Sequence, residues 1–294
     1  MGRTLQTILT MFKKIKIILE MIKFEHSIFA LPFVYIGAFL AQRGFPPWDK
    51  LFWILVAVVS ARSVAMAFNR LVDKDIDAQN PRTKDRTLPK GLLTPRWVIG
   101  FIIFCTFLFF VATYNLNRLV FYLSPVALFI ITGYSYTKRF TWLTHLFLGI
   151  ADGLAPLGGW LAIKPVFSIV PLWLFWGVAF WIAGFDILYS CLDYEFDKKQ
   201  GLHSIPVRFG IKNSLYLSTF FHILTVICFY YVGKDAQLNL FYFYGLGVVS
   251  LLLLYEHLII KPHDFSKLTM AFFTVNGVIS ISMFFIILVS LSCI

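Results

Sequence analysis

Nine long apolar runs restrict what this chain of 294 residues can fold into more than any other feature does. A helix needs about 20 predominantly apolar residues to cross a bilayer. The runs have about this length, and they cover 26–42, 51–71, 97–114, 118–135, 143–163, 169–190, 212–232, 238–258 and 270–291. We therefore expect an all-α integral membrane protein with nine transmembrane helices.

Composition agrees with a location in lipid. Apolar residues make up 59% of the chain and charged residues 14%, whereas a typical soluble chain has ~45–50% and ~25%. These values exclude a disordered chain, a disulfide scaffold, a coiled coil and an ordinary soluble enzyme. The formal net charge of +11 is typical of membrane proteins with basic cytoplasmic loops. We therefore do not expect a nucleic acid partner.

The distribution of Lys and Arg predicts the orientation of the chain. Segments on the side of the N-terminus carry twenty of these residues, and segments on the opposite side carry five. Because cytoplasmic loops are enriched in Lys and Arg, we expect a cytoplasmic N-terminus in the cell inner (plasma) membrane. Residues 1–25 are expected to form an interfacial amphipathic helix, followed by one transmembrane domain over 26–294.

The first acidic group follows the second apolar run. At about 100° per residue, Asn69, Asp73 and Asp77 share one face of a helix, and Asp75 points away from it. Arg62 lies two turns deeper on the same face. An ionisable side chain inside a membrane is costly and marks a functional site. The alternative is that these acids only solvate the end of a helix.

A second acidic group closes the sixth run and repeats the arrangement. Asp186, Asp193 and Asp197 share a helix face, and Tyr189 lies beside them. Carboxylates one turn apart repel each other and need a cation between them. Mg2+ is typically held by one or two carboxylates together with water and substrate phosphates. Two facing groups therefore predict two Mg2+ sites that bind a diphosphate on the cytoplasmic side.

Basic residues near both acidic groups are candidates for diphosphate binding, because Arg and Lys bind phosphate oxygens strongly when partly desolvated. These candidates are Arg86, Lys138, Arg139 and Lys198, and Tyr189 is also expected to contact the diphosphate. The deeper Arg62 could hold either the donor diphosphate or the carboxylate of an acceptor. Asp152 is an isolated acid within an apolar run, so it is a candidate cavity residue.

Taken together and in this order, the motifs resemble the UbiA superfamily of intramembrane prenyltransferases. The resemblance covers nearly the whole chain and implies nine helices around a lateral cavity that is open to lipid. It also implies two Mg2+ ions bound through the acidic motifs, a polyprenyl diphosphate donor and no obligate protein partner. The motifs that carry the resemblance are Asn69-x3-Asp73-x3-Asp77, Asn80-Pro81-Arg82-Thr83, Tyr134-x3-Lys138-Arg139, Asp186-x2-Tyr189-x3-Asp193-x3-Asp197 and Gly201-Leu202-His203-Ser204.

Within the superfamily the chain is most similar to 4-hydroxybenzoate polyprenyltransferases. This similarity implies transfer of a polyprenyl group to 4-hydroxybenzoate, ortho to its hydroxyl, with Arg62, Asp152, Asp186 and His203 as acceptor contacts. His203 replaces the Lys usual in that group, and residues 24–32 lack its Arg-x3-Pro-Ile-Gly signature. Both departures resemble a sister branch that prenylates a dihydroxynaphthoate in menaquinone biosynthesis, so this acceptor stays open. A transporter is a remote alternative, because transporters usually place ionisable groups near the bilayer midplane.

Overall fold

A computed structural model describes residues 14, 16–23, 27–262, 264–270 and 274–292 of the chain. Helices dominate, and the described residues form no β-strand beyond one isolated bridge between Lys261 and Asp264. The helices are α2 (Ser27–Gln42), α3 (Trp48–Val72), α4 (Lys74–Gln79), α5 (Pro95–Leu116), α6 (Arg118–Thr137), α7 (Thr144–Ile163), α8 (Ile169–Ser190), the 3-10 turn η2 (Cys191–Asp193), α9 (Tyr194–Gln200), α10 (Ile205–Phe209), α11 (Ile211–Asp235), α12 (Leu240–Ile259), α13 (Leu268–Met270) and α14 (Asn276–Ser292).

Seven helices in the described part of the chain are long and apolar enough to cross a membrane: α3, α5, α6, α7, α8 with its continuation to Gln200, α11 and α12. The apolar helices α2 and α14 are shorter. The all-helical membrane architecture is therefore confirmed. The described residues contain seven helices of spanning length, and the expected count of nine stays a prediction.

Helix boundaries follow local chemistry at several points. Pro95 occupies the first turn of α5, where its missing N–H costs no helix hydrogen bond. The side chain of Asn117 caps α6 by accepting from the Val120 N–H at 3.0 Å, and its amide donates to the Leu161 carbonyl at 2.8 Å. This single residue thus begins α6 and joins it to the end of α7.

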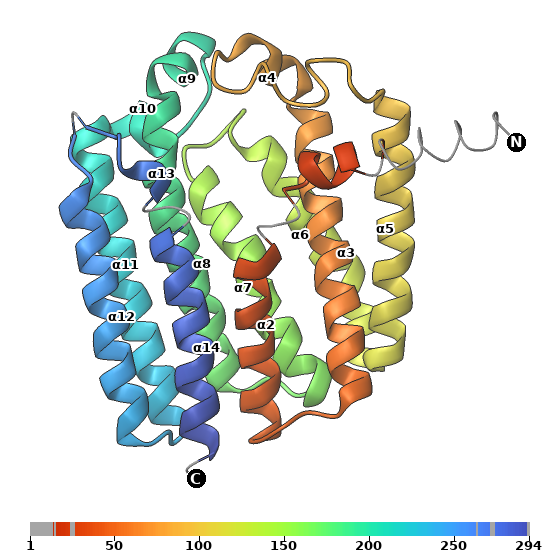
Figure 1. The fold of residues 1–294 in the computed structure, drawn as a ribbon, viewed down its shortest axis with the longest axis vertical. Helices are drawn as coiled ribbons and strands as arrows, with labels where there is room; N and C mark the ends of the chain where they lie inside the picture. The colour runs from red at the N-terminus through yellow and green to blue at the C-terminus, as the bar shows by residue number, and fades with distance from the viewer. Residues whose placement is uncertain (1–13, 15, 24–26, 263, 271–273, 293–294) are drawn as a thin grey trace, which may run out of the picture.

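Close backbone approach places α7 at the centre of the bundle, between α2 and α8 (Figure 1). A Cβ on Gly159 would lie 2.0 Å from the Val34 carbonyl oxygen of α2, and one on Gly149 would lie 2.1 Å from the Ala179 oxygen of α8. Small residues allow membrane helices to pack this closely. Gly159 and Gly149 therefore allow α7 to pack closely against α2 and α8.

Two apolar cores flank this central helix. One joins α2, α7, α8, α11, α12 and α14, and the other joins α2, α3, α5 and α7. Buried polar contacts also tie the first group together. Trp181 Nε1 of α8 donates to Asn276 Oδ1 of α14 at 2.8 Å, and the ring nitrogens of His222 and His257 lie 2.8 Å apart between α11 and α12. Hydrogen bonds of this kind link helices across a membrane bundle.

The N-terminal segment is only partly described. Residues 16–21 are helical, and the side chains of Met21 and Ile22 pack against Ala67 of α3, Leu88 and Val98. The predicted amphipathic helix over 1–25 otherwise falls on residues 1–13, 15, 24 and 25, which lie outside the described residues. That helix stays a prediction.

Candidate active site

A polar cavity of about 250 Å3 lies at the end of the bundle where α4, α9 and α10 are found (Figure 1). Both acidic groups line it, although they are more than one hundred residues apart in the chain. The predicted residues that line this cavity are Asn69, Asp73, Asp77, Arg86, Lys138, Asp186, Tyr189, Asp193, Asp197 and His203. The structure thus brings together most of the residues predicted for the site.

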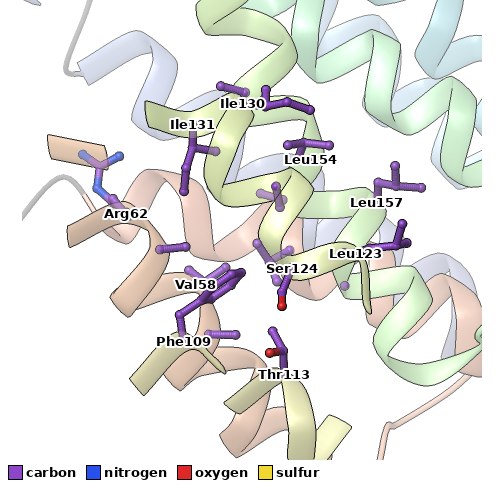
Figure 2. Close-up of a pocket in the computed structure, with 18 of the residues that line it drawn as sticks. Val58, Arg62, Phe109, Thr113, Leu123, Ser124, Ile130, Ile131, Leu154 and Leu157 are labelled. Carbon is purple, nitrogen blue, oxygen red and sulfur yellow. The ribbon is translucent and has the colours of Figure 1, made fainter. Parts of the chain in front are cut away.

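A second cavity of about 330 Å3 extends between α3, α5, α6 and α7 (Figure 2). Its walls are mainly aliphatic and aromatic, but Arg62 and Asp152 also line it. Tyr134 of α6 and Leu148 of α7 line both cavities. The polar and apolar spaces therefore adjoin at these two residues. The acceptor candidates Arg62 and Asp152 lie on the apolar side, and Asp186 and His203 lie on the polar side.

The first acidic group keeps one face across a break between α3 and α4. The Asp73 N–H donates to the Asn69 carbonyl at 2.9 Å, and the Asp77 N–H donates to the Asp73 carbonyl at 2.8 Å. Helical spacing is thus maintained through Asp73. Asp73 and Asp77 are 2% and 4% exposed, whereas Asp75 between them is exposed.

Asp73 is held by two cations from the end of α6. Lys138 Nζ donates to one carboxylate oxygen, and Arg139 Nη2 donates to the other at 3.0 Å. Arg139 also donates to the carbonyls of Val72 and Ser135, at 3.0 and 2.8 Å, and does not line either cavity. The two basic neighbours thus differ in position. Lys138 lines the polar cavity, whereas Arg139 binds Asp73 and lines neither cavity.

Asp77 pairs with Arg86, which comes from the segment between α4 and α5. Arg86 Nη1 lies 2.7 and 2.8 Å from the two carboxylate oxygens of Asp77. Because the Asp77 side chain is only 6% exposed, its charge needs such a partner. Arg86 is thereby positioned on the wall of the polar cavity.

Asp193 joins the two halves of the site. Arg82 donates from Nε to Asp193 Oδ1 at 2.9 Å and from Nη2 to Asp193 Oδ2. Asn80 Nδ2 also donates to Asp193 Oδ1, at 2.9 Å. Arg82 Nη1 also donates to the Tyr189 hydroxyl at 3.0 Å. Burial would lower the pKa of the Arg82 guanidinium, but its interactions with Asp193 outweigh burial and raise that pKa above its usual value. These contacts link the segment that follows α4 to Asp193 at the end of η2.

The second acidic group does not keep one continuous helix face, which corrects the sequence prediction. The chain passes from α8 through the 3-10 turn η2, which winds more tightly than an α-helix, before α9 begins. Asp186, which lies in α8 before this turn, pairs with His145 of α7 at 2.6 Å, whereas Asp193 at the end of η2 pairs with Arg82. Asp197 of α9 lines the polar cavity with both.

Two predicted basic contacts are placed differently. The ammonium of Lys198 lies 5.6 Å from the centre of the Tyr194 ring, and its exposed side chain lines neither cavity. His203 is exposed at the cavity edge, and its backbone N–H donates to the backbone carbonyl of Lys138 at 2.7 Å. Lys198 is therefore not assembled with the other candidates.

His145 is a positioning residue that the sequence analysis did not identify. It is 3% exposed; its Nδ1 lies 2.6 Å from Asp186, and its Nε2 accepts from the Ile205 N–H at 3.3 Å. With Nε2 as the acceptor, Nδ1 is the ring nitrogen that can donate to Asp186. The sequence could have indicated His145 through its polar side chain within the apolar run 143–163.

We predict that His145→Ala destabilises the protein by roughly 1–3 kcal/mol, because it leaves the Ile205 N–H without a buried acceptor and removes the donor to Asp186. Thermal unfolding in detergent measures the effect. His203→Ala is the matched control, since its side chain is exposed, and it should leave the melting temperature unchanged. Equal melting temperatures for wild type and His145→Ala would contradict this role.

The donor chemistry of the polar cavity suits a metal bound together with a ligand. No three acidic, His or Cys side chains within the described ranges converge closely enough to hold a metal ion by themselves. Mg2+ does not need such a cage, because it keeps several waters and uses one or two carboxylates plus substrate phosphates. The carboxylates of both acidic groups line one cavity together with Lys and Arg, and this donor set fits such a mode of binding.

Comparison with known proteins identifies the family of this chain. The UbiA prenyltransferase family matches residues 30–287 of the chain. The chain belongs to this family. The resemblance predicted from the motifs is thus confirmed, and the protein is a UbiA-type membrane enzyme.

Curated relatives cover most of this UbiA-family chain. The 4-hydroxybenzoate octaprenyltransferase of Vibrio campbellii is 28% identical over 81% of this chain and 84% of its own length. The 4-hydroxybenzoate solanesyltransferase of Synechocystis is 32% identical over 71% of each chain.

Solved structures agree on the fold. A UbiA homologue from Aeropyrum pernix superposes with a TM-score of 0.82 and 30% identity, over 90% of this chain and 98% of its own. A homologue from Archaeoglobus fulgidus, bound to GPP and Mg2+, has a TM-score of 0.68 and 22% identity, over 93% and 99%. The second likeness supports the fold alone.

Proposed function

We propose that this UbiA-family enzyme transfers a polyprenyl group from a polyprenyl diphosphate to 4-hydroxybenzoate, at the ring carbon ortho to the hydroxyl, with Mg2+ as cofactor. The observation that carries the proposal is the meeting of two acidic groups and their basic partners in one polar cavity that adjoins an apolar one. The names of the relatives from Vibrio campbellii and Synechocystis support this acceptor.

The polar cavity would bind the diphosphate. Asn69, Asp73, Asp77, Asp193 and Asp197 would hold Mg2+, which when bound would stabilise the charge that develops on the leaving diphosphate. Arg82, Arg86 and Lys138 line the same cavity and already present charged donors there. Their donors could turn from carboxylates to phosphate oxygens, since charge-assisted hydrogen bonds to phosphate are strong. These contacts favour release of diphosphate with the electrons of the allylic C–O bond.

The apolar cavity would bind the prenyl chain, and the acceptor would lie where the two cavities adjoin. Arg62 and Asp152 line one side of this junction, and Asp186 lines the other. Tyr134 lines both cavities, and its ring could stabilise an allylic cation through its π face. The ring carbon of the acceptor then bonds to the prenyl carbon and releases its proton, while the apolar walls exclude water.

The membrane arrangement is part of the proposal. The seven helices of spanning length, together with the shorter α2 and α14, would form nine transmembrane segments around a laterally open cavity. The excess of Lys and Arg on one side supports a cytoplasmic N-terminus in the inner membrane, with the polar cavity facing the cytoplasm. Residues 1–25 would lie at the interface as an amphipathic helix, and no protein partner would be needed for activity.

An acceptor panel tests the reaction. Membranes that contain the protein are incubated with Mg2+, a labelled polyprenyl diphosphate and either 4-hydroxybenzoate or a dihydroxynaphthoate. We expect prenylated 4-hydroxybenzoate, absent from membranes without the protein. Product from the naphthoate alone would show that the acceptor is a dihydroxynaphthoate, as in the menaquinone branch. No product from either acid would overturn the proposed function.

A further inference from the structure

The apolar cavity carries charge only near the polar cavity. Arg62 lies at one end, and Thr113 and Ser124 lie toward the other (Figure 2). The hydroxyl of Thr113 donates to the Phe110 carbonyl at 3.1 Å, and that of Ser124 donates to the Phe121 carbonyl at 2.6 Å. Both hydroxyls are thus satisfied within their own helices. The far part of the cavity therefore suits the apolar tail of a ligand whose charged head lies in the polar cavity.

The cavity is long in the direction of its helices. Its lining on α6 extends from Tyr134 to Val120, which is about 21 Å at a rise of 1.5 Å per residue. On α7 the lining includes Asp152 and continues to Leu161. Gly158 also lines it, about 9 Å along α7 from Asp152. Gly158 therefore lies between the charged end of the cavity and its far end.

Two adjacent glycines of α7 have different surroundings. A Cβ on Gly159 would lie 2.0 Å from the Val34 carbonyl oxygen, so the packing of α2 explains this glycine. A Cβ on Gly158 would meet no heavy atom within 4 Å. Glycine inside a helix costs roughly 0.5–1 kcal/mol relative to alanine. Packing does not explain Gly158, whereas an open cavity at its position does.

We propose that Gly158 determines the length of prenyl chain that the enzyme accepts, because its missing side chain leaves the cavity open beyond this level. The inference rests on the proposed function and adds a specificity residue to it. A larger side chain at this position would fill the part of the cavity between Asp152 and the far end without displacing backbone. Short prenyl chains would still fit between the charged end of the cavity and the new side chain, and long chains would not.

The test compares Gly158→Ala, Gly158→Leu and Gly158→Phe across dimethylallyl, geranyl, farnesyl, geranylgeranyl and octaprenyl diphosphate with 4-hydroxybenzoate. We expect the longest donor accepted to shorten as the side chain grows. For Gly158→Phe, kcat/KM with octaprenyl diphosphate should fall roughly ten- to hundredfold, the size of discrimination that a filled hydrophobic pocket provides. Its kcat/KM with dimethylallyl diphosphate should stay within about twofold of wild type.

Gly247→Phe on α12 is the matched control. A Cβ there also meets no heavy atom within 4 Å, and Gly247 is exposed and lines neither cavity. This variant should keep the wild-type length profile. A wild-type profile for Gly158→Phe and Gly158→Leu, or an equal loss for every donor, would overturn the inference.

Donor binding separates this inference from the proposed reaction. Thermal stabilisation of the detergent-solubilised protein by each donor with Mg2+ requires no turnover. In wild type it should increase with chain length, and in Gly158→Leu and Gly158→Phe it should stop increasing at a shorter donor. Identical curves for all proteins would overturn the role of Gly158. No product from wild type with either acceptor, alongside shifted binding curves, would overturn only the reaction.

Discussion

Asp73→Asn and Asp193→Asn should each reduce turnover on the order of 10²-fold or more, the loss typical when a group that stabilises transition-state charge is removed. Asparagine keeps the size of the side chain but removes the negative charge that attracts Mg2+. Folding should change little. The partners of Asp73, Lys138 and Arg139, are 27% and 31% exposed and can remain hydrated.

Neighbouring acids provide matched controls for these variants. Asp75 and Glu195 lie in the same two segments, but both are exposed and line neither cavity. Asp75→Asn and Glu195→Gln should retain wild-type turnover, measured as labelled product per unit of protein in the membrane. Near-normal activity in Asp73→Asn or Asp193→Asn would contradict the proposed mechanism, as would an equal loss in the controls.

Chelation of divalent metal should abolish turnover, and added Mg2+ should restore it. The carboxylates that line the cavity repel a diphosphate, so we expect its binding there to require Mg2+ in addition to the basic residues. The fold should survive chelation, since Asp73, Asp77 and Asp193 each have a Lys or Arg partner. The melting temperature without substrate should therefore be nearly the same with EDTA or Mg2+.

Chelated membranes must be free of product for this account to hold. Turnover at the wild-type rate in EDTA would show that metal is not required. A large fall in melting temperature on chelation would show instead that the metal is structural. Calcium is a useful comparison, because it accepts more ligands at longer distances than Mg2+, and we expect it to restore less activity.

Most of the membrane architecture was predictable from apolar runs. The run 51–71 corresponds to α3 over Trp48–Val72, and the run 169–190 has the bounds of α8. The runs are readable because lipid requires continuous apolar sequence. The runs 26–42 and 270–291 correspond to α2 and α14, which are shorter over the described residues.

Helical periodicity predicted the shared face of Asp73 and Asp77. The acids of the second group line the same cavity, although η2 interrupts their helix. The residues that pair with them were less accessible. Arg82 and Asn80 contact Asp193 from the non-helical segment between α4 and α5. Helical periodicity cannot predict contacts from such a segment, and only the sequence motif indicated these two residues. Lys198 follows an acidic residue directly, yet it extends into solvent, since a basic residue at a helix end is satisfied by water.

Crystals grown with Mn2+ in place of Mg2+ and a prenyl thiodiphosphate that cannot be cleaved give the most direct test of the site. Anomalous diffraction should show manganese in the polar cavity beside both acidic groups, near Asp73 and Asp77 on one wall and near Asp193 and Asp197 on the other, with the diphosphate between them. Manganese and diphosphate bound elsewhere, or bound by only one acidic group, would contradict the claim that both groups bind one substrate head together.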